Sequence, residues 1–260
     1  QARPALGVSI EGDGGAIFTC TVSASDLWGN TGFAILLTSA SLANGNQHIS
    51  GITLNGSSYA GWGAIGVWFR NNVTINNCTF TNFGHWGVRY YGGEPPTTYM
   101  TGSVFHDNIV TDCAGFWSSG GVQGVYNASS SSLGGLGIGG LDGMLIYNNT
   151  ITQPGIRGYA NEGEPIYGVE GFIKNVKIYN NTLSKTLITA GAWDFAIEIW
   201  NWLGGNEIYN NIITGSVDIV GATTKGTSTY SVWVHDNIIG QPALSTKQSV
   251  RGVLFEGLNT

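Results

Sequence analysis

Three acidic residues in the second half of the chain have the spacing of a stacked group of carboxylates. Each directly follows an apolar residue within a short apolar segment, and the pairs are Val169-Glu170, Ile197-Glu198 and Val217-Asp218. If the apolar residues point into a core, strand alternation places the acids outside on successive turns of a coil. Neighbouring carboxylates would then lie roughly 5 Å apart.

Carboxylates this close can do two kinds of chemistry. Like charges raise the pKa of at least one member of a pair, so that it stays protonated and can act as a general acid. A separation of about 5 to 5.5 Å is typical of retaining glycosidases, and one of about 6.5 to 9.5 Å is typical of inverting ones. Three stacked carboxylates could instead hold Ca²⁺, which prefers oxygen ligands. The alternative is that these acids are ordinary solvated surface residues.

Two arginines occupy similar outward positions. In the segment 87–91, inward Val88 and Tyr90 leave Arg89 and Tyr91 outside, and Arg157 lies in a similar segment. A guanidinium group binds a carboxylate or sulfate through two parallel hydrogen bonds, so both arginines are candidates for recognising an acidic substrate. A salt bridge to a nearby acid explains them equally well.

Aromatic residues surround the central acid. Trp193, Trp200 and Trp202 lie on both sides of Glu198, and exposed aromatic rings offer flat platforms for sugar rings. With Tyr91, they are candidate substrate-binding residues, although core packing is the alternative for each tryptophan.

Two further expectations concern individual residues. In the segment 66–70, inward Val67 and Phe69 would leave Trp68 and Arg70 outside. Among the histidines, we expect a structural role for His106 and His235, and His85 is a weak candidate for a general base.

These candidates must be positioned by a repeated element. A seven-residue motif, best represented by residues 177–183, recurs in related form seven times. Its first apolar column consists of Ile49, Ile75, Phe105, Ile146, Ile178, Ile208 and Val234, with steps of 26, 30, 41, 32, 30 and 26 residues. Repeats of this length predict a solenoid in which each repeat packs only against its neighbours.

The motif predicts strands rather than helices. Its segments are short, rich in Ile, Val, Thr and Tyr, and bounded by Gly and Asn. Asparagine at one position of each coil can form a ladder of side-chain amides at the strand spacing, and asparagine also tolerates the left-handed backbone of tight turns. The predicted fold class is all-β, a parallel solenoid of about eight coils with an asparagine ladder.

Over nearly its whole length, this pattern resembles the right-handed parallel β-helix superfamily, the pectate-lyase-like fold. That resemblance implies an architecture more than a chemistry, because the fold carries lyases, hydrolases, epimerases, phage spikes and adhesins. Polysaccharide lyases of this fold often use a metal ion to neutralise a uronate and a basic residue to remove the proton.

We expect one domain over residues 1–260, with an irregular first coil at 1–45 and longer loops at 111–143 and 152–168. The glycine-rich run 134–140 lies in the first of these loops. The segment 257–260 has no obvious cap, which suggests either a longer protein or an assembling unit.

Composition limits the possible partners. Only 10 % of the residues are charged and the net charge is −6, which disfavours nucleic acid as a partner. A neutral surface rich in hydroxyl groups suggests a secreted or cell-surface protein, and no apolar run reaches the length of a membrane span. The odd number of cysteines, Cys20, Cys78 and Cys113, suggests buried thiols, with one disulfide left open.

Taken together, the sequence predicts an extracellular protein that binds a polysaccharide and cleaves it by glycoside hydrolysis or lyase chemistry. The alternative is a non-catalytic surface, spike or filament subunit that associates with itself. We rank an ice-binding protein third, because the sequence shows no regular Thr-x-Thr array.

Overall fold

The computed structural model describes most of the repeated part of the chain. The described residues are 1–19, 32–59, 62–83, 87–92, 99–113, 134–153, 164–168, 173–185, 195–200, 202–220, 232–240 and 252–256. For some strand residues, among them 164–168, Glu198, Trp200, Asp218, Val220 and Glu256, the description covers the backbone only.

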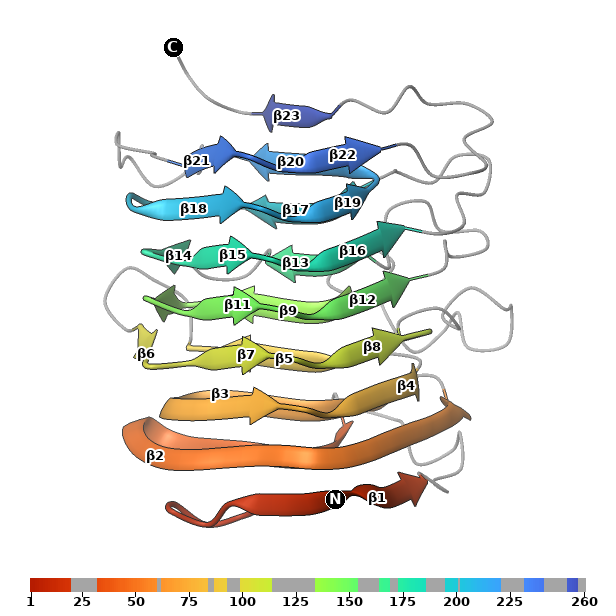
Figure 1. Cartoon of the computed structure of the whole chain (residues 1–260). Coiled ribbons are helices and arrows are strands. Elements are labelled where there is room, and N and C mark those ends of the chain that lie inside the picture. Colours follow the sequence, from red (N-terminus) through yellow and green to blue (C-terminus); the bar gives the residue numbers. More distant parts are fainter. Residues whose placement is uncertain are drawn as a thin grey trace, which may run out of the picture.

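The described chain winds into a parallel β-helix, and no helix occurs within it. Figure 1 shows the strands stacked coil upon coil from β1 to β23. Three stacks of parallel strands run along the solenoid, and the long strands at its N-terminal end join them into one 20-stranded sheet. This confirms the predicted fold class.

We call the first stack the tyrosine sheet, after the residues on its outer face. Its separate strands are β7 (Val104–His106), β11 (Leu145–Tyr147), β15 (Lys177–Tyr179), β18 (Asn206–Tyr209) and β21 (Val232–His235). Parts of β1 (Ile10–Thr19), β2 (Gly32–Tyr59) and β3 (Trp62–Asn76) continue it toward the N-terminus.

The second stack is the threonine sheet. Its strands are β4 (Thr79–Phe83), β8 (Ile109–Thr111), β12 (Thr150–Gln153), β16 (Thr182–Lys185), β19 (Ile212–Thr214) and β22 (Ile238–Gly240), preceded by parts of β1 and β2.

The third stack is the carboxylate sheet. Its strands are β5 (Val88–Tyr91), β9 (Gly134–Gly139), β13 (Glu164–Gly168), β17 (Phe195–Trp200), β20 (Ser216–Val220) and β23 (Val253–Glu256), preceded by the first parts of β2 and β3. A separate three-stranded sheet is made by β6 (Met100–Thr101), β10 (Leu141–Asp142) and β14 (Ile173–Lys174).

The two neighbouring asparagines of the motif have different roles at the corner between the tyrosine and threonine sheets. The first position is exposed and has a positive φ, as at Asn180 with φ 55°, which asparagine tolerates better than most residues. The second forms a ladder of side-chain amides, whose members are the buried Asn108, Asn149, Asn181 and Asn211 and the partly buried Asn237. Both expectations for asparagine are confirmed, but they apply to different residues.

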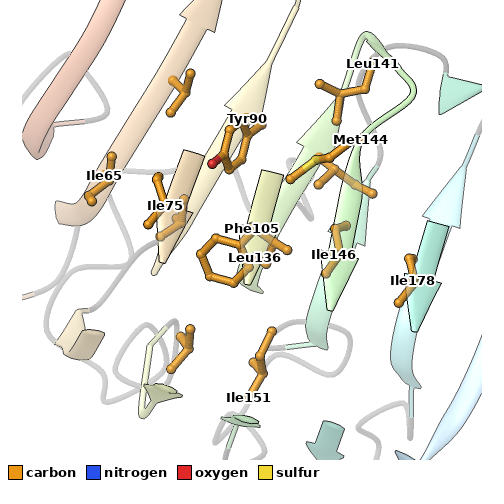
Figure 2. Close-up of a cluster of buried hydrophobic side chains, with 14 of the residues drawn as sticks. Ile65, Ile75, Tyr90, Phe105, Leu136, Leu141, Met144, Ile146, Ile151 and Ile178 are labelled. Atoms are coloured by element: carbon orange, nitrogen blue, oxygen red, sulfur yellow. The ribbon is translucent and has the colours of Figure 1, made fainter. Parts of the chain in front are cut away.

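Inward-pointing apolar residues of the three sheets fill the interior. Ile75, Phe105, Ile146 and Ile178 of the tyrosine sheet are all fully buried, and Figure 2 shows them in a row along the solenoid. Ile65 and Leu136 of the carboxylate sheet are fully buried in the same core. The core therefore extends along the whole winding, as expected for repeats that bury their apolar faces against neighbouring coils.

One glycine-rich region differs from the sequence expectation. The run 134–140, expected within a loop, contributes strand β9 to the carboxylate sheet. Glycine is needed nearby, because a Cβ atom on Gly92 would lie 2.0 Å from the carbonyl oxygen of Gly140 on the next coil. Close approach of the two backbones explains the glycines here better than loop flexibility does.

Candidate functional site

The carboxylate sheet brings most of the predicted site positions into one column. Paired residues on successive strands are Leu36, Gly66, Arg89, Gly137, Tyr167, Glu198, Asp218 and Leu254. Arg89, Glu198 and Asp218 therefore lie in one column of the sheet. Their unequal spacing in the sequence does not predict this alignment.

Glu198 and Asp218 occupy paired positions on β17 and β20. Each lies between two buried residues, as Glu198 does between Ile197 and Ile199, so strand alternation assigns both positions to the outer face. Parallel neighbours are separated by about 4.8 Å. The register expected between these two acids is therefore correct.

The register expected for the third acid differs. Ile166, not Val169, pairs with Ile197, so Tyr167 is the residue beside Glu198 on β13. Strand β13 begins at Glu164, within a segment expected to be a loop, and this earlier start shifts the alignment by three residues. Glu170 itself lies outside the described residues.

Calcium binding needs more oxygen ligands than this column provides. In this column Tyr167 is the neighbour of Glu198 and Leu254 is the neighbour of Asp218. The described column therefore contains two carboxylate positions rather than three. Elsewhere in the described residues, no group of three His, Cys, Asp or Glu side chains gathers in the way that a metal ion requires.

Arg89 lies where the alternation predicts. Its neighbours Val88 and Tyr90 are fully buried, whereas Arg89 and Tyr91 are half-buried on the outer side. The Cζ atom of Arg89 lies 5.0 Å from the centre of the Tyr91 ring, a distance typical of a cation–π contact. Both positions paired with Arg89, Gly66 and Gly137, are glycines. Arg157 lies outside the described residues.

An aromatic cluster surrounds Tyr91. Its ring makes edge contacts with Trp68 at 6.4 Å and Phe69 at 5.8 Å between centroids, and Trp68 contacts Phe33 at 6.0 Å. Trp68 is half-buried and continues the cluster beside Arg89. The sequence placed Tyr91 among the substrate-binding candidates, but it did not reveal this cluster.

The outward position expected for Arg70 is wrong. Arg70 is only 4 % exposed and donates hydrogen bonds to the oxygens of Pro4, Thr38, Ser39 and Gln47. Phe69 has a positive φ of 54°, which interrupts the alternation of the strand and turns Arg70 inward. Arg70 thus fastens the N-terminal segment to the first coils rather than facing a substrate.

The structure gives a different result for each of the three tryptophans near Glu198 that are candidate platforms for sugar rings. Trp202 is 1 % exposed and its Nε1 donates a hydrogen bond to the carbonyl of Ile199, so the expected platform at this position is wrong. Trp200 pairs with Val220 and lies two residues after Glu198 on the same strand. Trp193 lies outside the described residues.

The histidines of the tyrosine sheet take part in a stack of rings on its outer face. In chain order the rings belong to His106, Tyr147, Tyr179, Tyr209 and His235, with centroid separations of 4.8, 5.1, 5.0 and 5.2 Å. Nδ1 of His106 and His235 lies 2.6 and 2.8 Å from the carboxylate of the following aspartate. This packing agrees with the structural role expected for both residues, and His85 lies outside the described residues.

Two of the three cysteines are buried free thiols, as expected. Cys78 lies at the N-terminal end of the asparagine ladder, and Cys113 follows the threonine sheet strand β8. Burial raises the pKa of Cys78 and raises that of Cys113 to about 12. Such thiols are poor nucleophiles, and Cys20 lies outside the described residues.

Comparisons with models of protein families, with curated proteins and with solved structures give no significant match for this chain. No helix in the described residues has the length and hydropathy needed to cross a membrane.

Proposed function

We propose that this chain is a secreted or cell-surface protein that binds a polysaccharide along the carboxylate sheet and hydrolyses it with Glu198 and Asp218. The observation that carries the proposal is the pairing of these two acids on neighbouring strands in the same column as Arg89. The resemblance to the right-handed pectate-lyase-like superfamily supports it, because many members of that superfamily act on polysaccharides.

The strand spacing favours one of the two glycosidase mechanisms. Two carboxyl groups about 5 Å apart leave no room for a water molecule between acid and sugar, so one acts as acid and base and the other as nucleophile. Repulsion between the two charges would keep one of them protonated and ready to protonate the leaving oxygen.

Arg89 supports recognition of an acidic sugar. It lies three strand spacings from Glu198, or about 14 Å along the column. A carboxylate or sulfate bound there would hold a chain along the solenoid while the acids act on another unit. The net charge of −6 makes such a local cation important for any anionic substrate.

The test is an assay against a panel of neutral, uronate-containing and sulfated polysaccharides. We expect new reducing ends, and a loss of about 10²-fold or more in Glu198→Gln and in Asp218→Asn. The control is Glu207→Gln, which removes an acid of the tyrosine sheet that pairs with Lys177 at 3.2 Å. Unsaturated products that absorb in the ultraviolet would indicate a lyase instead. Undiminished cleavage by both acid variants, or no cleavage of any polysaccharide, would overturn the proposal.

A second candidate is self-association through the last described coil. Trp233, Ile238 and Phe255 are 63, 68 and 54 % exposed there, and Val234 and Ile239 are only partly buried, although the matching residues of the preceding coil are fully buried. Exposed strand edges with apolar residues favour pairing with another chain. Sedimentation of the protein should then show concentration-dependent oligomers that Ile238→Lys and Phe255→Lys abolish. A monomer at all concentrations would exclude this candidate.

A further inference from the structure

The outer face of the threonine sheet presents two regular columns of residues. The first column is Ile17, Thr53, Thr79, Ile109, Thr150, Thr182, Ile212 and Ile238. The second is Thr19, Asn55, Thr81, Thr111, Thr152, Ser184, Thr214 and Gly240. Two of the eight rows are Thr-x-Thr, at Thr79 with Thr81 and at Thr150 with Thr152, and the other rows have isoleucine, asparagine, serine or glycine at one or both positions. The sequence did not reveal the two columns, because coils of unequal length bring these segments into line.

The composition of the two columns is narrow. Every residue of the first column is β-branched, six of the eight residues in the second carry a hydroxyl group, and neither column contains a charge. Isoleucines of the first column are well exposed, with Ile109 at 49 % and Ile212 at 53 %. Exposed apolar groups in a regular, uncharged array mark a binding surface more than a solubilising one.

The array is also rigid and regular. From β4 to β22 the strands pair without a register shift, and Figure 1 shows them stacked one above another. The asparagine ladder fixes the position of the first residue of β12, β16 and β19, because Asn149, Asn181 and Asn211 directly precede these strands. β-branched side chains have few rotamers, so little entropy is lost when such a surface binds.

The spacing of the array is close to that of ice. Hydrogen-bonded oxygens about 2.75 Å apart in a tetrahedral lattice give a second-neighbour spacing of about 4.5 Å and a perpendicular repeat of about 7.3 Å. Successive rows of the array are about 4.8 Å apart, and its two columns are about 6.7 Å apart. Hydroxyl groups can occupy lattice positions while the γ-methyl groups fill the spaces between them.

We propose that the threonine sheet binds the surface of crystalline water through these two columns. The occupant is ice rather than a dissolved molecule, because the array contains neither a charge nor, within the described residues, a side chain able to enclose a ligand. The surface is separate from the carboxylate sheet, so this proposal is independent of the polysaccharide proposal.

The test measures partition of the protein into a growing ice front, together with thermal hysteresis and inhibition of ice recrystallisation. We expect the protein to enter ice, and Thr152→Lys and Thr182→Lys to weaken each effect by about tenfold or more. Ile212→Thr, which places a hydroxyl group in the first column, should preserve binding. The matched control is Thr74→Lys, which adds the same charge on the tyrosine sheet.

Circular dichroism of every variant distinguishes loss of folding from loss of binding. Exclusion of the unmodified protein from ice would overturn the proposal, and so would an equal loss in Thr74→Lys. Binding to microcrystalline cellulose or chitin that depends on Thr152 and Thr182, without ice binding, would assign the face to a crystalline polysaccharide. Dimers that dissociate in the same variants would assign it to a second copy of the chain.

Discussion

The side-chain amide of Asn149 donates a hydrogen bond to Oδ1 of Asn181 at 2.9 Å, and the backbone N–H of Asn149 donates to the same oxygen at 2.9 Å. Asn181 makes the same pair of bonds to Asn211 on the next coil. Each amide also donates to backbone carbonyls, so the ladder satisfies polar groups that the corner of the solenoid would otherwise bury without partners.

We predict that Asn181→Ala destabilises the protein by about 3 kcal/mol. The change removes five hydrogen bonds, two accepted by Oδ1 of Asn181 and three donated by its Nδ2, and leaves the buried N–H of Asn149 without its partner. Asn180→Gly is the neighbouring control, because residue 180 is exposed at φ 55°, where glycine is equally comfortable, and its cost should stay within about 0.5 kcal/mol. Urea unfolding measures both. Equal costs would contradict the division of roles between the two asparagines.

We predict that Arg70→Met destabilises the first coils by about 2 to 4 kcal/mol. Nη1 of Arg70 donates to the buried Gln47 at 2.9 Å and to the partly buried carbonyl of Pro4 at 3.0 Å, and methionine would leave both acceptors unpaired. Limited proteolysis should then cut earlier in the N-terminal segment. The control is Arg3→Met, since Arg3 is exposed and bonds only to nearby Gln1. Identical unfolding of Arg70→Met and the unmodified protein would refute this role.

We predict that stability decreases in alkaline solution. The pKa of Cys113 is raised by burial to about 12, whereas an unfolded thiol ionises near its ordinary value of 9. The folded state therefore holds a proton that the unfolded state loses, and ΔG of unfolding should fall by about 1.4 kcal/mol per pH unit across that interval. Cys113→Ala should make this part of the pH profile flatter.

Denaturant unfolding at several values from neutral to alkaline pH measures the effect. Burial also raises the pKa of Cys78 and Tyr90, so a weaker dependence should persist in Cys113→Ala. A thiol reagent in a Cys20→Ser background should not label the folded protein at neutral pH. Rapid labelling of Cys113 there would contradict its burial.

We predict that any glycoside hydrolysis proceeds with retention of anomeric configuration. This follows from the single strand spacing, about 4.8 Å, between the positions of Glu198 and Asp218. Proton NMR of the first product formed distinguishes the α and β anomers. Initial formation of the opposite anomer would require a wider separation of the two carboxyl groups, and would leave binding at Arg89 unaffected.

The sequence alone determined the winding, because the apolar columns, the paired asparagines and the strand-forming composition repeat locally in each coil. It also determined the pairing of Glu198 with Asp218, since only a short segment separates their strands. Only the tertiary structure decided which residues become neighbours when they are far apart in the sequence, or when a single backbone angle changes the direction of a side chain. The positive φ of Phe69 buried Arg70, and the early start of β13 placed Tyr167 beside Glu198. The threonine face arises from the alignment of coils of unequal length. Strands align through hydrogen bonds between their backbones, and this alignment does not depend on the length of the chain that connects them.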